Sequence, residues 1–192
     1  MPAEGQLTLR LFMGSLFLIS GYSKARDISS FLRGLDEYRV VTSEQARVLA
    51  YLIPFLELLI GVLCISGFLL SFAAFGSLLL TIVFTVAVLI NIGRGRSISC
   101  HCFGKSSASI SPLTLVRNFL LMGVSTFLLI LSLSVSATPF LQNWHRDFII
   151  LSHGETGAPV IAIVLLLLGT LLLVDEVDLT VLHPKSSRTR ET

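Results

Sequence analysis

Long apolar runs separated by short polar stretches dominate the chain, and runs of about 20 such residues predict membrane-spanning helices. The longest, 48–92, contains one carboxylate, Glu57, and no basic side chain. At ~1.5 Å per residue this run is too long for one crossing of a ~30 Å hydrocarbon core. We therefore expect a helical hairpin with its turn near Ser66-Gly67 or Ser71. The predicted spans are 7–23, 48–68, 70–92, 113–135 and 159–174.

The connection 24–47 has a different pattern. From Ile28 to Tyr38, apolar side chains recur at helical spacing between charged ones, which predicts a short amphipathic helix at the membrane surface, capping the bundle. Period-two alternation is missing from the apolar runs, which argues against β-barrel spans. The predicted fold class is an all-α polytopic transmembrane bundle of about five spans with a short interfacial amphipathic helix. Four spans, with the last apolar run elsewhere, is the alternative.

Composition agrees with this pattern. The chain is 53% hydrophobic and 14% charged, with a mean hydropathy of +0.84, whereas a soluble domain carries about a quarter charged residues. Its net charge of +2 does not suggest a nucleic-acid partner, and three cysteines are too few for a disulfide scaffold. We expect one transmembrane domain over 1–174, with a retained first span, and a polar C-terminal tail over 175–192.

The spans also predict which segments share a side of the membrane. The connections 24–47 and 93–112 and the tail 175–192 lie together, and twelve of the fourteen Lys and Arg residues lie there or at Arg117. By the positive-inside rule this side faces the cytoplasm. Arg10 belongs to the other side and is close enough to its span's end to extend its head group toward water.

The most reactive feature of the sequence is Cys100-His101-Cys102-Phe103-Gly104, in a polar, basic connection where neighbouring cations favour thiolate. A disulfide between residues two apart is strained and easily reduced, which suits a redox-active pair. Metal binding and inert thiols are the alternatives. Metal binding is disfavoured because structural zinc requires four ligands, so no metal site is predicted. Cys64 lies at the far end of its span, where we expect a small buried apolar residue.

Glu57 is the second feature, because a carboxylate inside a span costs roughly 2.5 kcal/mol or more unless it is paired, hydrated or protonated. It is either a functional group, such as a proton relay or ligand contact, or a partner in a structural ion pair. Four candidate partners lie toward the cysteine side: Lys24, Asn91, Arg117 and Asn118. Glu57 should lie ~14 Å deeper than that side's surface, so contact with Arg117 needs long side chains or a tilted helix. Small residues within spans are expected only to permit close packing: Gly14, Ser15, Ser20, Gly21, Gly61 and Gly76.

The order of these motifs resembles the methylamine utilisation protein family MauE, within the wider DoxX-like redox-associated membrane proteins. The resemblance covers about residues 10 to 130, and its most specific part is the Cys-x-Cys-Phe-Gly sequence after a Gly-Arg-Gly. The matching motifs are Gly21-Tyr22-Ser23-Lys24, the stretch 54–61 around Glu57, the stretch 91–96, Cys100 to Gly104, and Arg117-Asn118.

The resemblance implies a helper that matures a disulfide-rich, quinone-cofactor amine dehydrogenase, with a thioredoxin-like protein or the client subunit as partner. It implies Cys100 and Cys102 as the redox pair and Glu57, Lys24, Arg117 and Asn118 as a polar framework. Such a protein would be a thiol–disulfide oxidoreductase of the bacterial inner membrane. A quinone near Glu57 is a candidate cofactor, although the sequence requires none. The family role favours an outward-facing thiol pair, whereas the charge count predicts a cytoplasmic one. A non-catalytic scaffold for redox partners and a small-solute transporter using Glu57 are the rival functions.

Overall fold

The computed structural model describes residues 3–94, 112–134, 147–152 and 157–169. Every secondary-structure element in these ranges is helical, which confirms the predicted all-α class. The helices are α1 (Ala3–Arg26), α2 (Ile28–Tyr38), α3 (Ser43–Ser66), α4 (Leu70–Gly93) and α5 (Pro112–Ser134), followed by helical segments at 147–152 and Gly157–Gly169.

Three described helices are long and apolar enough to cross a membrane, namely α3, α4 and, within α5, Thr114–Leu133. Helix α1 is as long as α3, and Gly157–Gly169 is a shorter apolar helix. The protein is therefore a polytopic membrane protein, and this set of helices is compatible with about five spans. The division into a domain over 1–174 and a tail over 175–192 stays a prediction, because 170–192 lie outside the described residues.

Capping residues explain where α3 begins and ends. Thr42 and Gln45 form a reciprocal capping box, so the helix begins five residues before the predicted apolar span. Gly67 ends it in the left-handed region with φ of 71°, and its N–H donates to the carbonyl of Leu63. The predicted hairpin turn is thus located at 67–69.

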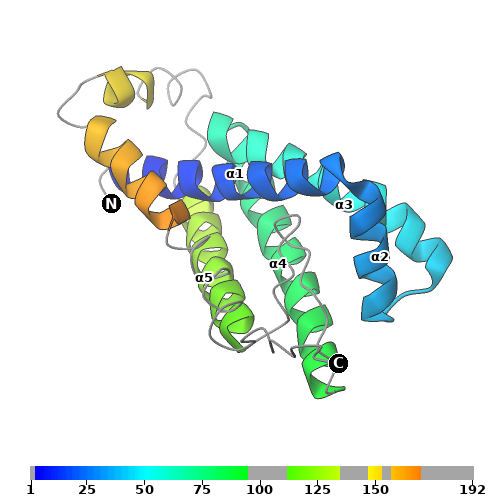
Figure 1. Ribbon diagram of the computed structural model, residues 1–192. Coiled ribbons are helices and arrows are strands. Elements are labelled where there is room, and N and C mark those ends of the chain that lie inside the picture. Colours follow the sequence, from blue (N-terminus) through cyan, green and yellow to red (C-terminus); the bar gives the residue numbers. More distant parts are fainter. Residues whose placement is uncertain (1–2, 95–111, 135–146, 153–156, 170–192) are drawn as a thin grey trace, which may run out of the picture.

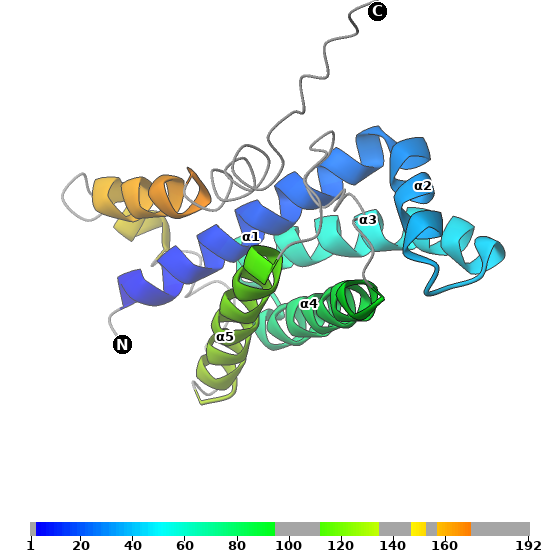
Figure 2. The same ribbon diagram turned by 60° about the horizontal axis from the view of Figure 1, so that its bottom comes forward.

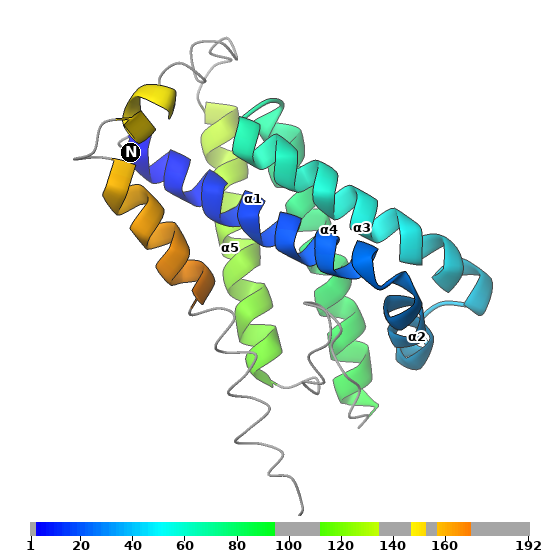
Figure 3. The same cartoon turned by 45° about the horizontal axis from the view of Figure 1, so that its top comes forward.

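Two helix pairs make up most of the bundle. Helix α1 packs most extensively against α3, and α4 packs against α5, as the side-by-side ribbons in Figures 1 and 3 show. Helix α2 turns sharply away from α1 at one end of the bundle (Figure 2). Its apolar face packs against α3 around Phe31, Ala50 and Ile53, so the amphipathic helix predicted from the sequence is present and covers the bundle.

Small residues allow α1 and α3 to approach closely. A Cβ atom on Gly61 would lie 2.8 Å from the Leu18 side chain and 2.9 Å from the carbonyl oxygen of Gly14. A Cβ atom on Gly14 would lie 2.5 Å from Ile65 Cγ1, and one on Gly21 would lie 3.0 Å from Glu57 Cβ. The expected packing role of these glycines is confirmed, and it brings Glu57 of α3 against α1.

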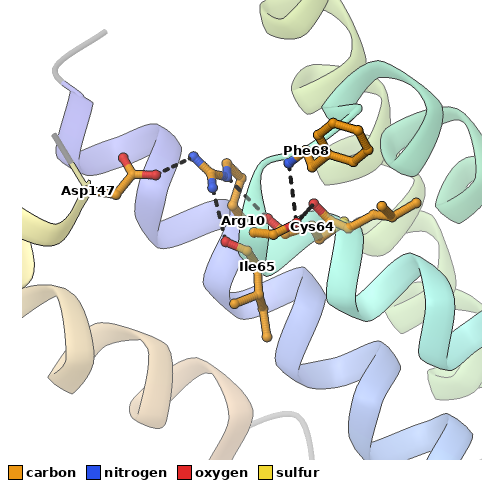
Figure 4. A network of polar contacts seen from close by, with 7 residues as sticks. Arg10, Cys64, Ile65, Phe68 and Asp147 are labelled. Atoms are coloured by element: carbon orange, nitrogen blue, oxygen red, sulfur yellow. Dashed lines mark hydrogen bonds and ion pairs between the residues drawn. The ribbon is translucent and has the colours of Figure 1, made fainter. Parts of the chain in front are cut away.

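Arg10 corrects one expectation from the sequence. Its side chain is buried rather than extended to water: Nη1 donates to Asp147 Oδ2 at 2.8 Å, while Nε and Nη2 donate to the carbonyls of Cys64 and Ile65 at 3.1 and 3.0 Å (Figure 4). The last carbonyls of α3 have no partners within the helix and accept hydrogen bonds from the guanidinium. The side chain is therefore held inside the bundle instead of extending to water. Cys64 is fully buried beside it, as predicted.

Side-chain contacts agree with the predicted pairing of segments at each end. Arg10 joins α1, the end of α3 and Asp147, so these three segments meet at one end of the bundle. At the opposite end, Arg94 Nη1 donates to the carbonyl of Arg39 at 3.1 Å, which joins the end of α4 to the connection after α2. Cys100, His101 and Cys102 lie outside the described residues.

Candidate functional site

A buried ion pair between α1 and α3 is the centre of the site. Lys24 Nζ donates to Glu57 Oε1, and the two side chains are only 2% and 3% exposed. Ser20, one helical turn before Lys24, accepts a hydrogen bond from Lys24 Nζ at 2.8 Å and donates its own to Glu57 Oε1 at 3.2 Å. Spacing of four residues puts Ser20 and Lys24 on the same face of α1, and Gly21 lets that face approach Glu57.

Two aromatic rings also lie close to the ammonium group. Lys24 Nζ lies 5.5 Å from the centre of the Phe31 ring and 4.9 Å from that of Phe84. Phe31 comes from α2 and Phe84 from α4, so four helices meet around one cation. Cation–π attraction of this kind strengthens when the cation is removed from water, as it is here.

A small cavity of about 50 Å³ connects this pair to α5. Glu57 and Lys24 line it together with Arg117 and Asn118, which are themselves 6% and 5% exposed. The cavity exceeds the space that one water molecule needs. Glu57 Oε2 has no hydrogen-bond partner among the described residues, so a water molecule or a ligand group in this cavity would find an acceptor.

The structure thus brings together Lys24, Glu57, Arg117 and Asn118, the four residues of the predicted polar framework. Asn91 is not joined to Glu57: it is fully buried, and its amide nitrogen donates to the carbonyl of Ala87 on its own helix. The two predicted redox cysteines and His101 lie outside the described residues.

Sequence reasoning missed Ser20, which it treated as a packing residue. Its hydroxyl links Lys24 to Glu57, and the signal that was available is its spacing of four residues before Lys24. Sequence reasoning also missed Tyr38 as a polar group, because it counted this partly buried side chain only in the apolar pattern of the helix. Burial raises the pKa of the Tyr38 phenol to about 12, with an opposing contribution from the nearby Arg117 charge, so this hydroxyl stays protonated and able to donate at neutral pH.

Among the described residues, no group of three or more His, Cys, Asp or Glu side chains is arranged to hold a metal ion.

Comparison with known proteins identifies the family. Residues 4–132, about two thirds of the chain, match the family described as Methylamine utilisation protein MauE. The chain belongs to the MauE family. The matched region runs from α1 into α5 and contains Cys100, Cys102 and all four framework residues.

Two curated relatives carry the same family name. The chain is 32% identical over 119 residues to Methylamine utilization protein MauE of Paracoccus denitrificans, covering 61% of this chain and 64% of the relative. It is 27% identical over 129 residues to Methylamine utilization protein MauE of Methylophilus methylotrophus, covering 66% and 68%. The match thus spans about two thirds of each relative's length. No solved structure gives a significant match to the chain.

Proposed function

We propose that this protein is a membrane helper of methylamine utilisation that performs thiol–disulfide exchange through Cys100 and Cys102 while a client enzyme matures. The observation that carries the proposal is that the MauE match includes a Cys-x-Cys pair in a basic connection between two membrane helices. The link to methylamine utilisation comes from the names of the two relatives. The exchange reaction is inferred from the thiol pair.

The exchange is balanced without further groups. A thiolate of one cysteine attacks a disulfide of the client or of a thioredoxin-like partner, and the released sulfur departs as thiolate. The second cysteine then attacks the mixed disulfide, which leaves Cys100 and Cys102 oxidised and the partner reduced by two electrons. In the opposite direction, a Cys100–Cys102 disulfide oxidises two thiols of the client.

Chain connectivity supports a link between the thiol pair and the polar framework. Helix α4 ends at Gly93 and α5 begins at Pro112, so the cysteines are joined to the ends of the two helices that, with α1 and α3, enclose the cavity. Cys100 follows Arg94 by six residues in the sequence. We assign Glu57, Lys24, Arg117 and Asn118 the role of fixing the helix ends that hold this connection.

The first test reads the thiol state of the client. Cells carrying Cys100→Ser or Cys102→Ser are treated with a maleimide that adds mass to free thiols, and the client is followed by its shift on a gel. We expect each variant to change the client's ratio of thiols to disulfides. Cys64→Ser is the matched control, because it removes a thiol that is fully buried near the C-terminal end of α3. If Cys100→Ser and Cys102→Ser both leave the client unchanged, the exchange function is wrong.

The same variants separate the rival functions. A scaffold would tolerate both loop substitutions but lose partner co-purification when the exposed face of α2 is altered, for example by Arg33→Glu and Asp36→Lys together. A transporter would depend on Glu57 more than on either thiol.

The side of the membrane is a separate proposal. We propose that the protein lies in a bacterial inner membrane. The positive-inside rule then predicts that the Cys100 and Cys102 pair faces the cytoplasm. A membrane-impermeant maleimide should therefore label Cys100 and Cys102 only after cells are lysed, with reductant present. Labelling in intact cells would place the pair outside and overturn the orientation while leaving the exchange chemistry in place.

A further inference from the structure

A second, larger hollow lies between α2, α3 and α4. It is a groove of about 440 Å³, which falls within the range of ~300–1,000 Å³ typical of small-molecule sites. Ile53 and Leu56 of α3 and Val83 of α4 contribute to its apolar walls. Val83 is 53% exposed on a helix apolar enough to span the membrane, so this wall adjoins the acyl chains of the lipid.

Two hydrogen-bond donors line this apolar groove. One is Lys24, whose ammonium group has three N–H donors and gives two of them to Ser20 and Glu57. Its nitrogen also lies 5.5 and 4.9 Å from the ring centres of Phe31 and Phe84, which line the groove too. The other donor is Tyr38, at the end of the interfacial helix α2.

We propose that this groove binds an isoprenoid quinone, with its ring against Phe31 and Phe84, its carbonyl oxygens accepting from Lys24 and Tyr38, and its tail leaving past Val83 into the lipid. A planar ring with two carbonyls matches two aromatic side chains and two donors, and an isoprenoid tail matches the apolar wall.

Charge distinguishes a quinone from a fatty acid. The lining contains no carboxylate, and its one cation, Lys24, is already paired with Glu57. A fatty-acid carboxylate would add an uncompensated negative charge, or displace Glu57 from Lys24, in a region of low dielectric. A quinone carbonyl is neutral and needs only the unused N–H. A plain acyl chain would offer no acceptor to the third N–H of Lys24 or to the Tyr38 hydroxyl, at a cost that a carbonyl avoids.

Binding of the quinone goes beyond the exchange reaction, although its role as electron acceptor for the thiol pair rests on the proposed function. In that role Cys100 and Cys102 as dithiol plus quinone give disulfide plus quinol, so two electrons and two protons pass to the quinone. A Cys100→Ser, Cys102→Ser double variant should bind quinone as the unmodified protein does. Failure to bind quinone would therefore leave the exchange proposal standing. A negative client thiol assay would likewise leave the quinone-binding proposal standing.

The test uses the full chain in lipid nanodiscs and an azido-ubiquinone photoprobe with a geranyl tail. We expect saturable labelling of peptides from α2 to α4 that excess decylubiquinone removes and excess oleate does not. Equal competition by oleate would show a general acyl-chain groove, and labelling that does not saturate would show no site. Either result overturns the proposal.

Matched variants locate the site. Val83→Trp fills the groove wall and should abolish saturable labelling, whereas Val62→Trp makes the same change at a position of similar exposure (55%) outside the groove and should not. Tyr38→Phe removes one hydroxyl without disturbing the fold and should weaken binding about fivefold, whereas Tyr51→Phe, on the exposed face of α3, should not. If each pair of variants binds equally, the groove is not the site.

Discussion

The buried pair of Lys24 and Glu57 gives the sharpest prediction about this fold. Both side chains are almost wholly excluded from the surface, at 2% and 3% exposure, and Ser20 is the bridging hydroxyl. Removing one partner of a buried ion pair costs ~3–5 kcal/mol, because the remaining charge stays buried without compensation. We therefore expect Lys24→Met, which leaves the carboxylate, to lower the free energy of unfolding by ~3 kcal/mol or more, and Glu57→Gln by a similar amount.

The double variant Lys24→Met, Glu57→Gln tests whether the cost arises from the pair. It contains neither charge, so its destabilisation should be smaller than the sum of the single effects by roughly 2 kcal/mol or more. Reversible unfolding in mixed detergent–SDS micelles measures all three free energies. Glu44→Gln is the control, because Glu44 is exposed in the first turn of the same helix, and it should change stability by no more than ~0.5 kcal/mol. Additive single effects, or equal effects at Glu57 and Glu44, would refute the reasoning.

Three further predictions use the described contacts. Gly61→Ala should destabilise the bundle by ~1–3 kcal/mol, because its Cβ would lie 2.8 Å from a neighbouring side chain, whereas Gly123→Ala, with nothing within 4 Å, should be neutral or stabilising in the same unfolding assay. Equal losses would contradict the close α1–α3 contact. Arg10→Met should cost ~3 kcal/mol or more and Arg33→Met, on the exposed face of α2, almost nothing; a harmless Arg10 variant would show that its buried network does not form. Cys64 should resist maleimide until SDS unfolds the protein, and rapid labelling in native membranes would contradict its burial.

Periodicity and helix-end signals predicted most of the fold. The length of the run 48–92 required a hairpin, and the glycine at 67 marked its turn, because a left-handed backbone suits glycine. The amphipathic helix after the first span followed from its apolar spacing. These features depend on residues close together in the sequence, which is why sequence alone could place them.

The pairing of buried charges could be predicted only in part. Lys24 was one of four candidates for Glu57, and the choice among them depends on the α1–α3 approach that Gly21 permits. The partner of Arg10 was missed entirely, because Asp147 is 137 residues away and belongs to a segment that the sequence treated as a connection. The groove was missed for a related reason. It lies where α2 packs against α3 beside α4, and no local sequence pattern predicts how these helices are placed relative to one another.

Capture of a mixed disulfide tests the central claim most directly. Cells are quenched with acid and alkylated, and the protein is examined without reductant, in single Ser variants of Cys100 and Cys102, in the double variant, and in Cys64→Ser. Exchange through this pair predicts that one of the two single variants accumulates a reductant-sensitive adduct with a client or thioredoxin-like partner, because its resolving thiol is gone. The double variant should show no adduct, and Cys64→Ser should match the unmodified protein. Absence of an adduct from both single variants, or its persistence in the double variant, would contradict the account.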